Sequence, residues 1–257
     1  MIRKFYILLI NLFFISCIDL ITDEEFYESI YLNKSGWFEF YENNQNQNIS
    51  LPNYFTFQIW LSGNADLNLE APCILNINNT YWDLAIYKNS NSNNFLMIYL
   101  NQELVSEIEI ENIDLHNPNN FYLISVVIKQ QNIIIYFNEN QIFETSIISD
   151  LNSEIIAGAY KNNETITNLW SGYVDEIRLW QDTLTTEIIT FHNQYPYKVS
   201  SSYEDPYLNN LIGLWDFRIN TLDENPSNRF QDINNNDNYT IIYTLESMTN
   251  ELSTNGR

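Results

Sequence analysis

Three glutamate residues at alternate positions have side chains that could act as catalytic acids, bases or nucleophiles. Glu107, Glu109 and Glu111 are separated by single isoleucines. Because alternate residues of a β-strand point to the same side, this run predicts a strand with three carboxylates on one face. A retaining glycosidase needs two carboxyl groups about 5–5.5 Å apart, a spacing that such a strand can supply. The alternative, which we favour, is a solvent-facing strand edge whose charges oppose aggregation.

A second candidate is Asp175, a carboxylate in the alternating segment 173–180, which we expect to follow a turn at 171–172. Alternation places Asp175 on the face that carries Ile177 and Leu179, so it would be buried at the rim of the core. The opposite face then carries Val174, Glu176, Arg178 and Trp180. A buried carboxylate needs hydrogen bonds or a metal ion. We favour backbone N–H groups of a neighbouring loop, and a bound Ca²⁺ is the alternative.

Alternating oxygen donors recur at Asp232, Asn234 and Asn236. Hard oxygen ligands of this kind are what Ca²⁺ prefers. An EF-hand loop, however, has glycine at its sixth position and a closing acid at its twelfth, where this sequence has Asp237 and Tyr243. We therefore favour a turn and keep a Ca²⁺ site as the alternative.

Four aromatic residues close to predicted loops could form a ligand-binding surface. Aromatic rings offer flat apolar area on which the apolar faces of sugar rings can stack, and Tyr and Trp add a polar group. The alternative for each ring is burial in the hydrophobic core. The four residues are Tyr81, Trp82, Tyr160 and Trp170.

The N-terminal segment predicts export and lipidation. Arg3 and Lys4 precede an apolar run at 5–15, which is too short to span a bilayer comfortably. The run ends in Phe-Ile-Ser-Cys, which resembles a bacterial lipobox ending at Cys17. This resemblance implies a lipoprotein signal peptide at 1–16, a lipid on Cys17 and an acidic tether at 17–30. The expected location is the bacterial outer membrane, surface-exposed, and an ordinary secretory signal is the alternative.

Composition narrows the range of partners. The chain has 257 residues and a formal net charge of −22, so nucleic acid is excluded as an expected partner and an anionic membrane surface would repel it. We expect contact with the membrane through the lipid anchor alone. If Cys17 carries a lipid, Cys73 is the remaining cysteine, and its apolar surroundings predict a buried, inert thiol.

Short alternating or apolar segments separated by Asn-rich turns predict a protein built from β-strands. The expected strands are 37–41, 55–61, 74–77, 81–87, 95–100, 121–128 and 133–138, together with 173–180. Thr185 or Thr186 can cap a short helix, with Glu187 close behind it. Two strands as continuously apolar as 121–128 and 133–138 must be covered on both faces, which predicts a two-sheet antiparallel sandwich.

The segment 172–180 is Gly-Tyr-Val-Asp-Glu-Ile-Arg-Leu-Trp, and it resembles the closing motif of laminin G-like jelly rolls, Gly-x-Ile-Asp-Glu-Val-Arg-Ile-Trp. Leu-Ile-Gly-Leu-Trp-Asp-Phe at 211–217 likewise resembles the strand that usually opens such domains. The resemblance implies an all-β jelly-roll sandwich of the concanavalin A-like lectin and glucanase fold. We expect the laminin G-like domain at 31–198 and strands completing the same sandwich at 199–257.

The same resemblance implies a non-catalytic binding protein that recognises glycans or other surface ligands. Glu107, Glu109 and Glu111 resemble the catalytic Glu-x-Asp-x-Glu strand of laminarinase-type glycosidases, but Glu109 stands where that family has Asp. A glycoside hydrolase that uses these three residues is one alternative, and a purely structural envelope protein is another. We expect no enzymatic activity.

Overall fold

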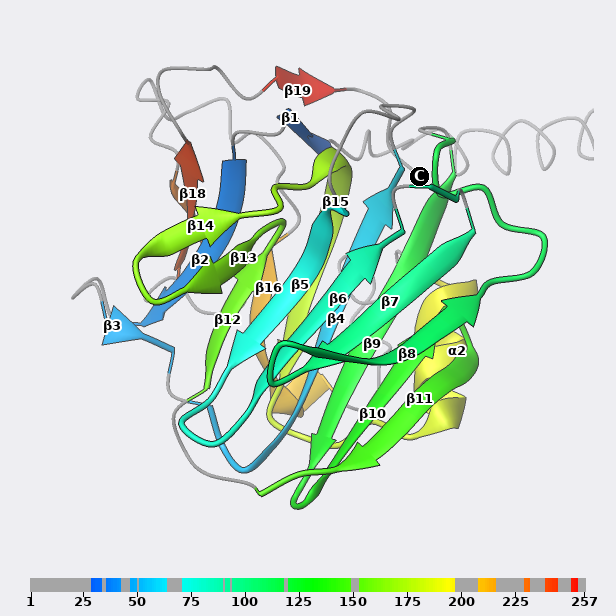
Figure 1. Cartoon of the computed structure of the whole chain (residues 1–257). Coiled ribbons are helices and arrows are strands. Elements are labelled where there is room, and N and C mark those ends of the chain that lie inside the picture. The colour runs from blue at the N-terminus through cyan, green and yellow to red at the C-terminus, as the bar shows by residue number, and fades with distance from the viewer. Residues whose placement is uncertain are drawn as a thin grey trace, which may run out of the picture.

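Two antiparallel β-sheets packed face to face make up the fold (Figure 1). The computed structural model describes residues 29–33, 36–42, 47–49, 51–63, 71–89, 91–92, 94–117, 120–148, 153–196, 208–215, 229–231, 239–244 and 251–253. Every pairing between the described strands is antiparallel. The predicted sandwich, with a short helix after Thr185, is confirmed.

The first sheet, called sheet A, is eight-stranded in the described part of the chain. Its order is β11 (Asn140–Ser146), β10 (Asn132–Phe137), β9 (Phe121–Lys129), β4 (Tyr54–Ser62), β15 (Ser171–Trp180), β1 (Ser29–Asn33) and β19 (Glu251–Ser253). β16 (Leu211–Trp215) pairs with the second half of β15, whose first half pairs with β1.

The second sheet, called sheet B, has nine described strands. Its order is β17 (Arg229–Gln231), β18 (Tyr239–Thr244), β2 (Gly36–Glu42), β12 (Glu154–Ala157), β5 (Cys73–Asn78), β6 (Asp83–Lys88), β7 (Phe95–Leu100) and β8 (Glu103–Glu109). β3 (Gln47–Asn48) pairs with β2, and β13 (Tyr160–Asn162) forms a separate hairpin with β14 (Thr165–Thr167).

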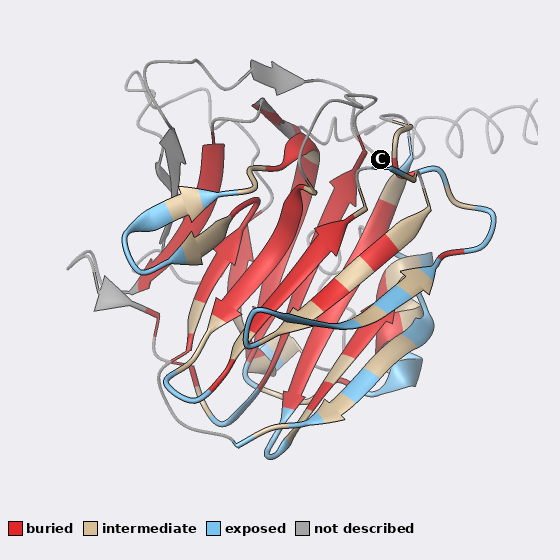
Figure 2. Cartoon of the chain, viewed as in Figure 1, coloured by how far each residue is buried: buried red, intermediate tan, exposed pale blue. Residues whose placement is uncertain are grey.

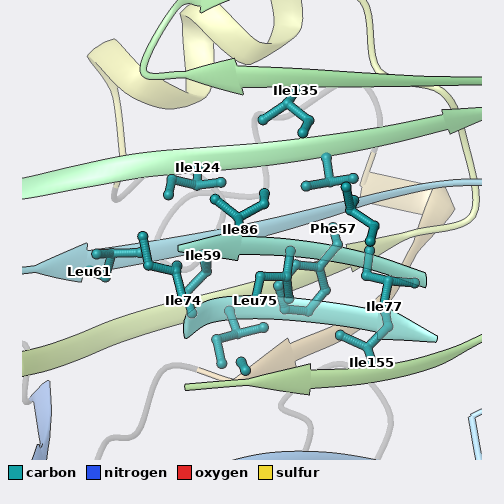
Figure 3. Close-up of a cluster of buried hydrophobic side chains, with 14 of the residues drawn as sticks. Phe57, Ile59, Leu61, Ile74, Leu75, Ile77, Ile86, Ile124, Ile135 and Ile155 are labelled. Carbon is teal, nitrogen blue, oxygen red and sulfur yellow. The ribbon is translucent and has the colours of Figure 1, made fainter. Parts of the chain in front are cut away.

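Branched aliphatic and aromatic side chains from the inner faces of both sheets form the main core. Figure 3 shows Phe57, Ile59 and Ile124 of sheet A opposite Ile77 and Ile86 of sheet B. All five are at most 1% exposed. In these strands, every second side chain points to the opposite sheet, as the period-two alternation of the sequence predicts.

The outer face of sheet A is covered by helix α2 (Thr186–Gln194), which follows the N-cap residue Thr185. Ile189 of α2 packs with Leu123, Val127 and Trp180 in a second apolar cluster. The 3-10 helix η1 (Leu208–Asn210) leads into β16 beside it. No helix in the described ranges is long and apolar enough to cross a membrane.

Polar groups buried between α2 and sheet A are hydrogen-bonded. Gln58 accepts a hydrogen bond at Oε1 from Trp180 Nε1 (2.9 Å), and His192 Nδ1 lies 3.0 Å from the same oxygen. The His192 ring stacks on Trp180. Glu176 and Arg178 form a buried ion pair, and the guanidinium lies 4.3 Å from the centre of the Trp60 ring. The contacts of His192 with Gln58 and Trp180 fix the helix on sheet A.

Strand β15 differs from the prediction in two ways. Residues 171–172 belong to the strand and not to a turn. A β-bulge lies between Val174 and Ile177 in the pairing with β4, so strict alternation fails there. Val174 therefore joins Ile177 and Leu179 in the main core, on the face opposite to the one predicted. Asp175 and Glu176 occupy the bulge.

Asparagine replaces glycine at several turns of this glycine-poor chain. Asn101 and Gln102, with φ of 53° and 66°, form the two-residue turn from β7 to β8, and Asn138 has φ of 53° between β10 and β11. Asn adopts this left-handed conformation more readily than other non-glycine residues. Gly158 is needed where β12 leads into the hairpin, because its φ is +86° and a Cβ there would lie 2.8 Å from Leu32.

Candidate functional site

Aromatic side chains gather on the outer face of sheet B, over β6 and β7. The register places Tyr87 opposite Met97 and Ala85 opposite Tyr99. Tyr160, the first residue of β13, packs against the same cluster. We call the surface formed by Tyr87, Met97, Tyr99 and Tyr160, together with Asp83, the tyrosine face. β6, β7 and β13, which carry these residues, lie in front of the strands of sheet A in Figure 1.

The rings of the tyrosine face support one another. The Tyr87 and Tyr99 ring centres are 5.1 Å apart in an edge-to-face arrangement, and the Tyr87 and Tyr160 centres are 6.0 Å apart. Tyr87 is buried at 8% exposure, whereas Tyr99, Tyr160 and Met97 are partly exposed. Tyr87 thus lies beneath Tyr99 and Tyr160, and the rings of these two residues present apolar surface to solvent.

Asp83 supplies the hydrogen-bonding group of this surface. Its Oδ2 accepts a hydrogen bond from the Tyr160 hydroxyl (2.7 Å), and its Oδ1 accepts one from Asn76 Nδ2 (2.7 Å). Burial raises the pKa of Asp83, although both hydrogen bonds lower it. Burial and the nearby Asp83 carboxylate also raise the pKa of Tyr160, which keeps its hydroxyl protonated as a donor. Each carboxylate oxygen can accept a further hydrogen bond from a ligand hydroxyl.

The β13–β14 hairpin that carries Tyr160 is anchored to sheet B beside this face. Asn76 Oδ1 accepts a hydrogen bond from the backbone N–H of Lys161 (3.1 Å), and Asn78 Nδ2 donates one to the Lys161 carbonyl (3.1 Å). The Lys161 ammonium lies 2.7 Å from Glu154 Oε1 and 3.5 Å from Glu39 Oε1. These contacts fix the position of Tyr160 relative to Asp83.

The four predicted ligand-binding aromatics are not brought together. Tyr160 belongs to the tyrosine face, and Tyr81 is 60% exposed in the turn before β6. Trp82 and Trp170 are 5% and 2% exposed and belong to the main core, so the prediction that their rings offer a binding surface is wrong. Their nearness to loops in the sequence does not prevent the folded chain from covering them.

The three alternating carboxylates do not share one strand. β8 ends at Glu109, and Glu111 lies in the following turn, so the prediction of a strand with three carboxylates is wrong at its end. Glu107 and Glu109 are exposed on the edge strand of sheet B, which is largely uncovered in Figure 2. Asn89 Nδ2 donates to Glu107 (2.6 Å), and Asn94 Nδ2 donates to Glu109 (3.1 Å).

Asp175 is fully buried in the bulge of β15. Within the described ranges, no group of three or more His, Cys, Asp or Glu side chains is arranged to hold a metal ion. Asp232, Asn234 and Asn236 lie outside the described residues, as do Cys17 and the predicted signal peptide. Cys73 is fully buried, and burial raises the pKa of its thiol well above the usual value.

Sequence reasoning missed Asp83, Tyr87, Met97 and Tyr99. A signal was present, because alternation on β6 and β7 sets Tyr87 and Tyr99 on the face opposite to Ile86 and Ile98. What the sequence did not supply was the pairing that places these side chains next to one another and next to the hairpin.

No protein-family model and no curated protein matches this sequence, whereas solved structures do match the fold. A proposed carbohydrate-binding protein from Bacteroides ovatus superposes with a TM-score of 0.56 at 12% identity, over 86% of this chain and 60% of that protein. A heptameric SAP-like pentraxin from Limulus polyphemus gives 0.45 at 14% identity, over 65% and 82% of the two chains. Mouse laminin α1 domains LG4-5 give 0.40 at 9% identity, over 62% and 43%. The match to the Bacteroides ovatus structure agrees with the two-sheet antiparallel jelly-roll sandwich described above.

Proposed function

We propose that this protein is a non-catalytic glycan-binding protein whose binding surface is the tyrosine face. The observation that carries the proposal is the combination of two partly exposed tyrosine rings, Tyr99 and Tyr160, with the hydrogen-bonded carboxylate of Asp83. Binding sites for small molecules combine apolar and aromatic area with a few fixed polar groups. A sugar ring matches both, because its C–H groups can lie on the tyrosines while its hydroxyls donate to the carboxylate.

The side chains of the tyrosine face are already held in place before a ligand binds. Tyr87 and Tyr99 lie on paired strands inside a sheet, and the Tyr160 hydroxyl donates a hydrogen bond to Asp83. Side chains that are already ordered lose less conformational entropy when a ligand binds. A jelly-roll fold shared with a proposed carbohydrate-binding protein agrees with this function.

We further propose that the protein acts at the bacterial cell surface, held in the outer membrane by a lipid on Cys17. The lipobox-like sequence before Cys17 supports this location. A single lipidated residue in front of a folded β-sandwich would leave the tyrosine face outside the bilayer.

The test is a glycan-array screen of the full chain, followed by titration with the best-bound glycans. Tyr99→Ala removes an outer ring and should weaken binding about tenfold, as truncation of a central aromatic contact commonly does. Tyr160→Phe keeps the ring, removes the hydrogen bond to Asp83 and should have a smaller effect. Tyr54→Ala is the matched control, because Tyr54 is 45% exposed at the start of β4 in the other sheet. Equal binding by Tyr99→Ala and wild type would overturn the assignment of this face.

The hydrolase alternative needs its own measurement. We expect neither wild type nor Glu107→Gln to cleave β-glucans, because Glu107 and Glu109 are solvent-exposed and accept hydrogen bonds from asparagine side chains. Cleavage by the wild type that is lost in Glu107→Gln would replace the binding function with an enzymatic one.

A further inference from the structure

Carboxylates lie within the tyrosine face and along the edge strand β8 beside it. Asp83 lies within the face, and Glu107 pairs across the strands with Met97 of the face. Glu109 follows on the same edge strand, opposite Phe95. All three side chains reach solvent at least in part. A ligand lying on Tyr99 and Tyr160 would therefore meet negative charge from two directions.

The ammonium group of Lys161, the residue after Tyr160, already forms ion pairs. Lys161 lies between Glu154 and Glu39, at 2.7 and 3.5 Å. Glu39 is held in turn by hydrogen bonds from Trp37 Nε1 (2.9 Å) and the Tyr41 hydroxyl (2.6 Å). Because Lys161 serves two carboxylates, it does not offset Asp83 and Glu107. The remaining charge of the surface is negative.

We propose that the tyrosine face selects neutral glycans and rejects glycans that carry carboxylate or sulfate groups. This inference rests on the proposed glycan-binding function and names the substrate class of the same site. An anionic group placed about 4 Å from one exposed carboxylate is disfavoured roughly sixfold in water. The formal net charge of −22 adds a long-range repulsion that slows the approach of any polyanion.

Pairs of related glycans, one member with a free carboxylate and the other without, test this selectivity. Suitable probes are methyl-esterified and de-esterified galacturonan, together with lactose and sialyllactose. Each glycan is immobilised, and the full chain is added to it. We expect the neutral member of each pair that binds to bind at least tenfold more tightly. Raising the salt from about 0.05 to 0.5 M should narrow that difference, since exposed charges are screened, while binding of the neutral member changes little.

A charge-matched pair of variants locates the effect. Glu107→Gln removes one charge beside the tyrosine face, and Glu144→Gln removes one from β11 at the edge of sheet A. Glu107→Gln should raise the affinity for the acidic member roughly threefold. Glu144→Gln should leave it unchanged. Equal gains in the two variants would assign the repulsion to net charge and overturn the inference.

The remaining outcomes separate this inference from the function on which it rests. If acidic members bind as tightly as neutral ones and Tyr99→Ala weakens both, the glycan-binding function stands and the selectivity is wrong. If no glycan of either kind is retained by the wild type, the proposed function itself fails.

Discussion

Lys88, the last residue of β6, is 4% exposed and follows Leu84 and Ile86 on the inward side of the strand. Burial lowers the pKa of its ammonium from 10.5 to about 8, an effect that the nearby Asp114 carboxylate reduces but does not cancel. The neighbouring His116 also has a lowered pKa, caused first by burial and then by Lys88. The charged form of Lys88 is therefore destabilised in the folded protein.

The sign of the resulting pH dependence follows from proton binding. Below pH 8 the lysine is charged in the folded and unfolded states, and the folded state carries the full desolvation penalty. Between pH 8 and 10.5 the folded state loses the proton while the unfolded state keeps it, so the free energy of unfolding rises with pH. The total rise is about 3 kcal/mol, from the size of the pKa shift.

Lys88→Met keeps the length of the side chain and removes the charge. We expect the variant to be more stable than wild type by about 3 kcal/mol at pH 7, and the difference to vanish towards pH 10.5. Urea unfolding of both proteins, followed by tryptophan fluorescence at several pH values, measures it. The difference curve is needed because Cys73, whose pKa is raised, lowers stability as pH increases. A variant that is no more stable than wild type at pH 7 would refute the argument.

Two further predictions concern the ends of the chain. Cys17→Ser should abolish lipid labelling and release the protein from the membrane fraction, and a variant that stays in the membrane after a carbonate wash would contradict the proposed anchor. Trp215→Ala should lower the free energy of unfolding by about 3–5 kcal/mol, because Trp215 is fully buried in the main core with its ring 4.9 Å from that of Phe40. A loss below about 0.5 kcal/mol, measured by urea unfolding, would show that β16 contributes little to the sandwich.

Much of the fold was predictable because the strands of a sandwich alternate between core and solvent. The segment 55–61 was expected as a strand and is found as β4, Tyr54–Ser62, and 133–138 is found as β10, Asn132–Phe137. The β1 strand was not anticipated at Ser29, because its first residues fall within the acidic segment 17–30 that reads as a tether. The rest of that segment lies outside the described residues.

The bulge and the binding surface were less accessible to sequence reasoning. A bulge is a property of the pairing between β15 and β4, and the residue types between Val174 and Ile177 do not predict it. The tyrosine face depends likewise on the packing of separate strands, because Tyr99 of β7 and Tyr160 of β13 both reach Tyr87 of β6 only in the folded chain. Trp170 shows the converse, since a tryptophan near a loop is buried once the sheets close over it.

The first two strands of the chain, β1 and β2, pair with strands that come much later in the sequence. Ile30 of β1 pairs with Val174 of β15, and Phe38 of β2 pairs with Ile242 of β18. Contacts so distant in sequence slow folding, because the loop between them must close before they form. During synthesis from the N-terminus, β1 would lack β15 until residue 180 had been made, and β2 would lack β18 until residue 244 had been made. During that interval, we expect a need for protection against aggregation.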